Sequence, residues 1–480
     1  MIKPGNTATF LLKYMEACPL KFIVEACNGK LLRGSGETLV RRVCTDSRQA
    51  QPGDVFFAIK GDKFDGHDFI EEVAKKGVVA VVVAHSQTKF VTPNETECAV
   101  IAVDWPRLAL GIFSAAYRAE FDLPVIAVGG SNGKTTTKEL IAAVLRQKLN
   151  TLWSEASFNN DIGVPLTLLR LEKSHQAAVL EVGTNHPGEM PPLLMMIRPK
   201  FAVITNIGRE HLEFFGNAAG VAEEEGWLAE LLPSEGKLFL NGDDEWSLRI
   251  ADRTRAGVVR VGLNAGNLWR AVEVRLSRQG ATFRVAAPDP AWSGEYKINL
   301  LGRHQIVNAL FAVAVGAELG LSREEIQRGL AECQPANMRL QISDAHGVTI
   351  LDDTYNANAD SMLAALSVLK DLPGNGRRLA VLGDMAELGA QSESAHAEVG
   401  RRAAELGVGQ LFAVGKMAGV MGNAAREAGL ARVVEFAEVE AAASAMKSFV
   451  KPGDVVLLKA SRATHLERVA EALRGETSGK

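Results

Sequence analysis

Short apolar runs alternate with segments of helical periodicity along most of this chain. In the first hundred residues, strand-like runs at 55–59 and 78–83 flank a helical pattern at 69–76. From residue 348 onward, five more apolar runs alternate with helical patterns, near 348–352, 379–383, 410–414, 432–436 and 454–458. Strands that alternate with helices are typical of parallel sheets covered on both faces. The pattern predicts an α/β fold whose C-terminal part is a doubly wound, Rossmann-like domain.

The middle of the chain carries a similar pattern. Continuous apolar runs at 177–182 and 201–205 predict strands that are buried on both faces. A period-two pattern that begins at Ala271 predicts a β-hairpin, and the sequence Ser322–Glu325 predicts a capped helix start. We therefore expect a mostly parallel central sheet, followed by a hairpin and two helices.

The length of 480 residues is too great for one ordinary core and suggests several domains. The pattern of the first part ends near Asp104, where a helix at about 108–120 leads into the next strand. The central part ends at about residue 337, shortly before the C-terminal alternation begins. We predict three α/β domains, a small one at 1–104, a central one at 105–337 and a last one at 338–480.

Composition and charge narrow the classes of partner. Apolar residues make up 47% and charged residues 23% of the chain, as in globular proteins, and the formal net charge is −4. Since no long basic run is present, we expect small-molecule substrates and no nucleic acid. The five cysteines are scattered without CxxC spacing, so neither a disulfide framework nor a zinc site is indicated. No apolar run is long enough to span a bilayer, and we expect a cytoplasmic protein.

The strongest functional signal is a glycine-rich turn between the apolar run Val125–Val128 and a helical pattern. Glycines let the backbone approach an anion, and the amides at a helix start point toward it. A lysine in such a loop supplies charge to the β and γ phosphates, and the following threonine can bind magnesium. The predicted ATP-binding residues are Gly130, Ser131, Asn132, Gly133, Lys134, Thr135 and Thr136.

Other chemically active residues follow predicted strands, where ligands of parallel sheets collect. Glu181 ends one central strand and is placed to hold magnesium beside the phosphate loop, unless it is simply a solvated charge. His211 follows the next strand, and on position alone it is more typical of a surface residue. In the C-terminal domain, polar clusters follow three strands, at 351–358, 383–389 and 459–462. We expect these clusters to line one crevice.

Taken together, these segments resemble the Mur ligases, cytoplasmic ATP-dependent enzymes that build the peptide stem of bacterial cell-wall precursors. The similar segments of the central part are 130–136, 159–165, 181–189 and 302–308. Segments 352–362 and 383–389 are similar to the branch that adds a D-alanyl-D-alanine dipeptide. Segments 45–48 and 61–67 resemble the family's uridine-nucleotide domain.

The resemblance implies an ATP-dependent amide-bond-forming ligase of peptidoglycan biosynthesis, which supports cell shape and cell division. A carboxylate of UDP-N-acetylmuramoyl tripeptide would take the γ-phosphoryl group of ATP, and the amine of D-alanyl-D-alanine would attack the resulting acyl phosphate. The implied cofactors are ATP and Mg²⁺, and the implied state is a cytoplasmic monomer. In order, the three domains would bind the UDP precursor, ATP and the dipeptide.

The resemblance also implies roles for single residues, carried over by position. Lys134, Glu181 and His211 would be catalytic, with Thr135 and Glu181 on one magnesium ion and His211 on a second. The implied ATP contacts beyond the phosphate loop are Asn308 at the adenine, Asp353 at the ribose and Arg339 at the phosphates. The implied UDP-substrate contacts are Ser47, Arg48 and Asn159, and the implied dipeptide contacts are Tyr355, Asn356, Asn358 and Ser461.

One departure from the family pattern bears on the chemistry. The family usually has a lysine that becomes carbamylated and binds the second magnesium, but no lysine occurs here between Lys200 and Lys237. Three consecutive glutamates end at Glu225 instead. A carbamate is in effect a carboxylate on a long stem, so we hypothesise that Glu225 replaces it as a direct or indirect magnesium ligand.

Two alternatives stay open. The missing lysine would also fit a catalytically weakened, nucleotide-binding paralogue, although the intact phosphate loop, Glu181 and His211 favour an active enzyme. A related amide ligase with another acceptor would share the same loop. The neutral amides in the segment Asp353–Asn358 favour a zwitterionic dipeptide as the acceptor over an acceptor of another kind.

Overall fold

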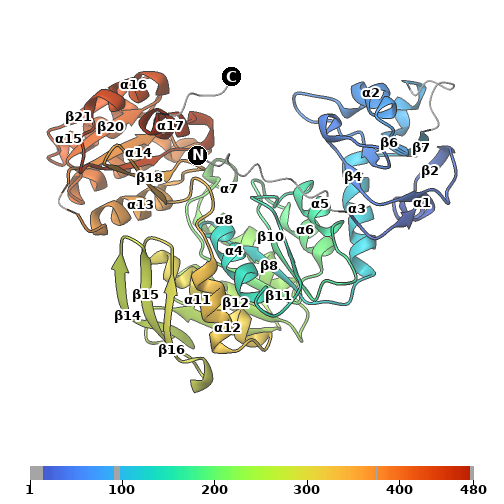
Figure 1. Cartoon of the computed structure of the whole chain (residues 1–480), viewed down its shortest axis with the longest axis horizontal. Coiled ribbons are helices and arrows are strands. Elements are labelled where there is room, and N and C mark those ends of the chain that lie inside the picture. Colours follow the sequence, from blue (N-terminus) through green and yellow to red (C-terminus); the bar gives the residue numbers. More distant parts are fainter. Residues whose placement is uncertain (1–13, 91–97, 375, 476–480) are drawn as a thin grey trace, which may run out of the picture. The chain divides into compact units, whose positions relative to one another are not determined.

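The computed structural model describes residues 14–90, 98–374 and 376–475, and Figure 1 labels its helices and strands. The contacts within the chain divide it into two compact units. The first unit comprises the chain up to Pro124 together with Ser157–Ala178 and Pro192–Arg198. The second comprises Val125–Ala156, Val179–Pro191 and the chain from Pro199 onward. The described strands form sheets of two, five, six and nine strands.

The first unit is built on a five-stranded sheet in the order β2-β7-β6-β5-β4. Strands β4 to β7 pair in parallel, and β2 pairs antiparallel with β7. The strands are β1 Cys18–Pro19, β2 Lys30–Arg33, β3 Leu39–Val40, β4 Val43–Cys44, β5 Val55–Phe57, β6 Ala80–Ala84 and β7 Ala99–Val103. The helices are α1 Leu20–Ala26, α2 Ile70–Lys75, α3 Pro106–Ala119 and α5 Gly163–Leu168. The predicted pair of strands and the helix between them are confirmed.

The nine-stranded sheet has the order β16-β15-β14-β13-β12-β11-β8-β10-β9. Strands β8, β11, β12, β13 and β14 pair in parallel, and β14, β15 and β16 pair antiparallel. The predicted hairpin therefore extends the central sheet. The strands are β8 Val125–Gly129, β9 Thr151–Trp153, β10 Ala177–Glu181, β11 Phe201–Ile204, β12 Lys237–Asn241, β13 Gly257–Gly262, β14 Trp269–Ser277, β15 Gly280–Ala286 and β16 Gly294–Ile298.

The helices around this sheet fix the position of α4, which begins in the glycine-rich turn. Helix α11 is apolar on nearly all sides, as expected for a helix buried from Gln305 to Ala317. It packs against α4, and a Cβ atom on Gly316 would lie only 2.8 Å from Val144 Cγ1. The helices of the second unit's central part are α4 Lys134–Leu145, α7 Leu212–Phe215, α8 Ala218–Glu225, α9 Trp227–Glu230, α10 Glu245–Ile250, α11 His304–Glu318 and α12 Arg323–Glu332. Helix α6 spans Met190–Ile197, and most of it belongs to the first unit.

The C-terminal sheet has six strands in the order β17-β18-β22-β19-β20-β21, parallel except for the edge strand β17. The strands are β17 Gln341–Ala345, β18 Val348–Asp353, β19 Arg378–Gly383, β20 Gln410–Val414, β21 Val433–Phe436 and β22 Val455–Lys459. The helices are α13 Ala359–Asp371, α14 Ser392–Glu405, α15 Ala418–Glu427, α16 Val439–Phe449 and α17 Glu467–Arg474. All five predicted strands are confirmed, and so is the doubly wound α/β class. The edge strand β17 was not predicted.

Helices α14 and α15 approach closely through Gly400, where a Cβ atom would lie 2.1 Å from the Met421 carbonyl oxygen. We predict that Gly400→Ala lowers the free energy of unfolding by about 1–3 kcal/mol, because the two helices must separate. Gly419→Ala on α15 is the matched control, since its nearest neighbour would be Glu435 Oε2 at 3.7 Å. Urea unfolding should show the loss for Gly400→Ala alone; equal losses would contradict the prediction.

Candidate active site

The glycine-rich turn connects the end of β8 to the start of α4. Gly130 and Gly133 have φ angles of +107° and +86°, which other residues rarely adopt. A Cβ atom on Gly130 would lie 2.8 Å from the Thr205 amide nitrogen, and one on Gly133 would lie 2.8 Å from Asn308 Oδ1. The turn therefore requires glycine at both positions. Asn308, the predicted adenine contact, lies directly behind it and donates to Gln305 Oε1 at 2.8 Å.

Asn206, which follows β11, holds this turn in shape. Its carbonyl oxygen accepts a hydrogen bond from the Ser131 amide at 2.8 Å, and its Oδ1 accepts one from the Asn132 amide at 3.0 Å. Its Nδ2 donates to the Asn132 carbonyl oxygen at 2.8 Å. The sequence alone does not indicate this role of Asn206, because its partner Asn132 lies 74 residues away in the chain.

Lys134 lies at the centre of a group of acidic side chains. Its Nζ donates to the Gly130 carbonyl oxygen at 2.6 Å and lies 3.2 Å from Glu210 Oε2. Burial lowers the pKa of Lys134, but the carboxylates of Glu210, Glu225 and Glu181 outweigh burial and raise the pKa overall. Lys134 therefore carries its charge where phosphates are predicted to bind. Glu210 is a further residue that the sequence analysis missed.

The consecutive glutamates of α8 contact two different loops. Glu225 Oε2 accepts a hydrogen bond from the Gly130 amide at 2.7 Å. Glu224 accepts hydrogen bonds from the amides of Gly188 and Met190, at 2.8 and 2.7 Å, in the loop after β10. Burial raises the pKa of Glu225 to about 8, against the opposing effect of Lys134. Glu225 thus lies at the phosphate loop, where the magnesium hypothesis needs it.

Glu181 ends β10 and is 1% exposed. Its amide donates to Ser154 Oγ at 2.8 Å, and the fully buried Lys138 donates to the carbonyl oxygens of Ser154 and Ala156 at 2.7 and 2.9 Å. Glu181 is therefore a buried carboxylate at the strand end. The Thr135 hydroxyl is also buried and has no hydrogen-bond partner in the described part of the chain.

These side chains fit a magnesium ion by their chemistry. Hydroxyl and carboxylate oxygens are the protein ligands that Mg²⁺ takes, usually one or two of them together with phosphate oxygens and water. Thr135 offers an unsatisfied buried oxygen, and the carboxylates near Lys134 outnumber that single positive charge. Within residues 14–90, 98–374 and 376–475, no three His, Cys, Asp or Glu side chains form a ready-made metal cluster. Bound phosphates would have to complete the coordination.

His211 lies at the start of α7 with a φ angle of +48°. Its Nδ1 pairs with Glu387 Oε2 from the loop after β19, and its Nε2 lies 3.9 Å from Glu210 Oε2. The hydrogen bond from His211 lowers the pKa of Glu387, although burial opposes this. His211 is thus largely buried between acidic side chains, unlike the surface residue that its position alone suggests.

Neighbouring strands β18 and β22 bring a second ion pair to the same edge of the C-terminal sheet. Asp353 ends β18 opposite Lys459 at the end of β22. Lys459 Nζ lies 2.6 Å from Asp353 Oδ2 and donates to the Asn356 carbonyl oxygen at 2.9 Å. Burial raises the pKa of Asp353, with Lys459 opposing the shift. The predicted ribose contact is therefore held by a lysine of the predicted cluster 459–462, whose individual role the sequence does not indicate.

Arg339, a predicted ATP contact that precedes β17, lies beside the predicted dipeptide residues that follow β18. The Arg339 guanidinium lies over the Tyr355 ring, 4.2 Å from its centroid. Asn358 caps α13 and its Nδ2 donates to Asn132 Oδ1 in the phosphate loop at 3.0 Å. The cluster at 351–358 therefore contacts the phosphate loop directly.

The other two C-terminal clusters are held by local hydrogen bonds. The Ser461 amide donates to the Asp384 carbonyl oxygen at 2.9 Å, which joins the loops after β22 and β19. His396 is fully buried, accepts from the Met385 amide at 2.9 Å and donates to the Ser392 carbonyl oxygen at 2.7 Å. Burial lowers its pKa, so the neutral ring shapes the 383–389 turn.

The first unit contains a groove of about 390 Å³. Its lining residues are Thr45, Ile59, Gly61, Asp62, Lys63, Phe64 and Ile162. Of the predicted UDP-substrate contacts, Ser47 is buried in the 3-10 turn that follows Thr45, Arg48 pairs with Asp46 at 2.7 Å, and Asn159 is partly exposed. The groove thus lies at the predicted segments 45–48 and 61–67.

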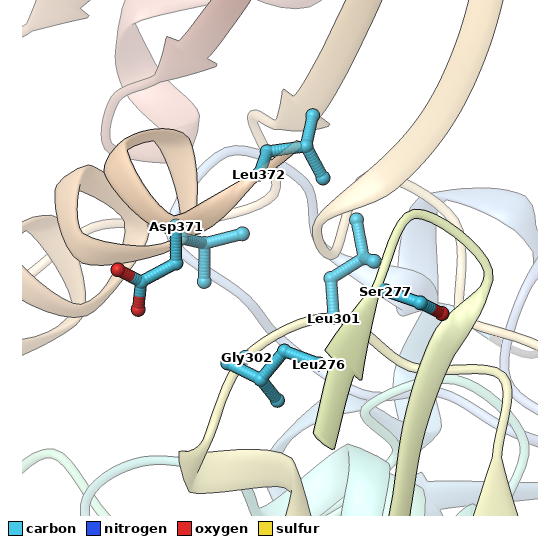
Figure 2. Close-up of a pocket in the computed structure, with 7 residues that line it drawn as sticks. Leu276, Ser277, Leu301, Gly302, Asp371 and Leu372 are labelled. Atoms are coloured by element: carbon cyan, nitrogen blue, oxygen red, sulfur yellow. The ribbon is translucent and has the colours of Figure 1, made fainter. Parts of the chain in front are cut away.

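A small gap occurs where the β14–β15 hairpin meets α13 (Figure 2). Figure 2 shows Leu276 and Ser277 of the hairpin on one side of the gap and Asp371 and Leu372 at the end of α13 on the other, with the Asp371 carboxylate turned away from the hairpin. The gap measures about 10 Å³, which is room for one water molecule at most. This contact is therefore a packing surface of the second unit and leaves no space for a ligand.

Three family profiles match most of the chain. "Mur ligase family, catalytic domain" matches residues 39–118, "Mur ligase middle domain" matches 128–316, and "Mur ligase, glutamate ligase domain" matches 338–462. The chain belongs to the Mur ligase family. Since members of this family are ATP-dependent amide ligases, the predicted enzyme class is confirmed.

Individual relatives agree over nearly their whole length. The chain is 36% identical to the UDP-N-acetylmuramoyl-tripeptide--D-alanyl-D-alanine ligase of Escherichia coli, covering 96% of this chain and 99% of that protein. The chain is 34% identical to the ligase of the same name from Bacillus subtilis, and the match covers 95% of this chain and 98% of that protein. A crystal structure of MurF from Acinetobacter baumannii matches with a TM-score of 0.87 and 33% identity, and the match covers 96% of this chain and 100% of that one. The structure of MurF ligase from Thermotoga maritima in complex with ADP matches with a TM-score of 0.78 and 28% identity, and the match covers 91% of this chain and 97% of that one.

Among the described residues, no helix combines the length and apolar character that a membrane crossing needs.

We predict that Lys134→Ala lowers ATP turnover about 100-fold or more, because the charge aimed at the phosphates is lost. Lys148→Ala is the matched control. Lys148 is exposed and donates to the carbonyl oxygen of Gly320, which follows α11. Phosphate release from ATP in the presence of substrates measures both variants. Near-normal turnover of Lys134→Ala would remove this lysine from the mechanism.

Proposed function

We propose that this ligase adds D-alanyl-D-alanine to UDP-N-acetylmuramoyl tripeptide at the expense of ATP. The tripeptide carboxylate attacks the γ phosphorus of ATP, the bond from this phosphorus to the bridging β–γ oxygen breaks, and an acyl phosphate and ADP result. The amine of the dipeptide attacks this carbonyl carbon, loses a proton and expels inorganic phosphate, which leaves an amide bond. The names of the full-length relatives from E. coli and B. subtilis support this choice of substrates.

The contact between Asn132 and Asn358 carries the proposal. It joins the phosphate loop to the polar loop after β18 through a hydrogen bond of 3.0 Å. An amine bound near Tyr355, Asn356 and Asn358 would therefore lie close to the γ-phosphoryl group that the loop holds. Amide formation through an acyl phosphate needs this proximity, because the two reacting groups come from different substrates.

Lys134 and the residues around it are proposed to bind ATP, Mg²⁺ and the dipeptide. Lys134 neutralises phosphate charge, while Asn308, Asp353 and Arg339 bind adenine, ribose and phosphates. Thr135 and Glu181 would hold one Mg²⁺ ion, and His211 would help hold a second, with Glu225 as its direct or indirect ligand. Bound Mg²⁺ supplies positive charge that stabilises the transferring phosphoryl group. Ser461 completes the dipeptide site beside the loop that ends in Asn358.

The groove of the first unit is proposed as the uridine-nucleotide site. Thr45 and Lys63 offer polar groups within it, and Phe64 offers an aromatic ring that is 72% exposed. An exposed aromatic ring beside a lysine suits a base that carries a diphosphate. Ser47, Arg48 and Asn159 would complete the contacts. A cytoplasmic location is part of the same proposal, because its three substrates are soluble cytosolic molecules, and a monomeric state is proposed with it.

We predict that phosphate release from ATP requires both UDP-N-acetylmuramoyl tripeptide and D-alanyl-D-alanine. The reason is that the acyl phosphate forms on the first substrate and is consumed by the second. Purified protein in magnesium buffer, assayed with each substrate omitted in turn, tests this. Release with the tripeptide but with a different amine acceptor would favour a related amide ligase, and no release under any condition would favour the weakened paralogue.

Glu225 allows a separate prediction about the missing lysine. Glu225→Ala should lower turnover about 100-fold while ATP binding is largely kept, since a buried carboxylate at the phosphate loop is lost. Glu223→Ala is the matched control. Glu223 precedes Glu224 and Glu225 on the same helix, but its side chain is 74% exposed. Turnover of the natural chain should be indifferent to bicarbonate, whereas Glu225→Lys should gain a dependence on bicarbonate. Unchanged turnover of Glu225→Ala would contradict the hypothesis.

A further inference from the structure

Arg209, in the loop after β11, binds two carboxylates of the C-terminal sheet's helices. Its amide and Nε donate to Asp360 Oδ2 and Oδ1 at 2.7 and 2.8 Å. Its Nη1 donates to Glu398 Oε2 at 2.6 Å. Asp360 lies in the first turn of α13 and Glu398 lies on α14, so one side chain joins three elements.

The environment of this arginine makes the contact specific. The three side chains are 32–35% exposed, so they are partly shielded from solvent. The preceding Gly208 lets Asp360 approach, because a Cβ atom on it would lie 2.7 Å from Asp360 Oδ2. A planar guanidinium that binds one carboxylate through two groups fixes orientation as well as distance.

Arg209 acts on the site through the loop that ends at α13. Asp360 is two residues from Asn358, whose side chain contacts Asn132 of the phosphate loop. The residues after Arg209 make the next contacts, since Glu210 pairs with Lys134 and His211 pairs with Glu387. The segment from Arg209 to His211 therefore touches the phosphate loop on one side and the C-terminal loops on the other.

We propose that Arg209, through its bridge to Asp360 and Glu398, is the positioning residue that sets the dipeptide-binding loop against the phosphate loop. The inference rests on the proposed function for the identity of the dipeptide. Without Arg209 the loop at 354–361 keeps its own residues but loses its fixed placement, whereas Asp353 stays at the end of β18, where Lys459 holds it. Binding of the acceptor dipeptide then suffers, and binding of ATP does not.

The test compares Arg209→Ala with Arg278→Ala. Arg278 is the matched control, because it also joins the central part to the C-terminal sheet, through Asp344 at 2.6 Å, but it lies on the hairpin away from the strand ends. For Arg209→Ala the KM for D-alanyl-D-alanine should rise about tenfold, with the KM for ATP within about twofold of the natural chain. Arg278→Ala should change neither constant.

A double-mutant cycle and a conservative variant sharpen this result. Glu398→Ala should raise the dipeptide KM by itself and add little to Arg209→Ala, because both remove the same bridge. Arg209→Lys should restore part of the loss, since it keeps the charge without the planar fork. Additive effects of Arg209→Ala and Glu398→Ala, or equal rises in the KM for ATP and dipeptide, would overturn the proposal.

Amide hydrogen exchange gives a readout that does not need activity. Arg209→Ala should speed exchange in the segment 356–366 several-fold, and Arg278→Ala should leave this segment unchanged. If the natural chain shows no dipeptide-dependent turnover, the proposed function fails while the exchange result still decides the role of Arg209. Unchanged exchange in Arg209→Ala would overturn that role.

Discussion

The structure around the phosphate loop depends on the balance of charge at Lys134. Glu181, Glu210 and Glu225 are each less than 8% exposed, and together they raise the pKa of the single lysine among them. Buried charges are costly unless they are paired and hydrogen-bonded. The Gly130 amide and the Lys134 ammonium group supply part of that pairing. A site with surplus carboxylate is suited to recruiting a divalent cation together with a polyphosphate.

The loop after β11 contacts both Lys134 and the C-terminal part of the chain. Asn206 shapes the phosphate loop, Glu210 pairs with Lys134, and Arg209 and His211 reach carboxylates of the C-terminal sheet. Phosphoryl transfer asks a protein for positioning and for charge more than for a nucleophile. A single short loop that touches both the phosphate loop and the acceptor loop meets the positioning requirement.

Glu225 lies in the segment where the sequence departs from the family pattern. The hypothesis from the sequence was that a carboxylate stands in for a carbamate at this place. The carboxylate does lie at the phosphate loop, bound to the Gly130 amide, while its neighbour Glu224 holds the loop after β10. Residues adjacent on a helix point about 100° apart, so each can serve a different loop.

The sequence by itself determined the α/β class, the alternation of strands and helices in the C-terminal part, the family and the ligase class, all of which are confirmed. These features depend on local periodicity and on contiguous motifs, and the phosphate loop between β8 and α4 is the clearest case. The roles given to single site residues stay predictions. Only the tertiary structure revealed Asn206, Glu210, Lys459 and Arg209 as partners of Asn132, Lys134, Asp353 and Asp360. Their pairings join segments 74 to 151 residues apart. Periodicity does not encode such pairings, because they depend on how strands and loops from distant parts of the chain come together.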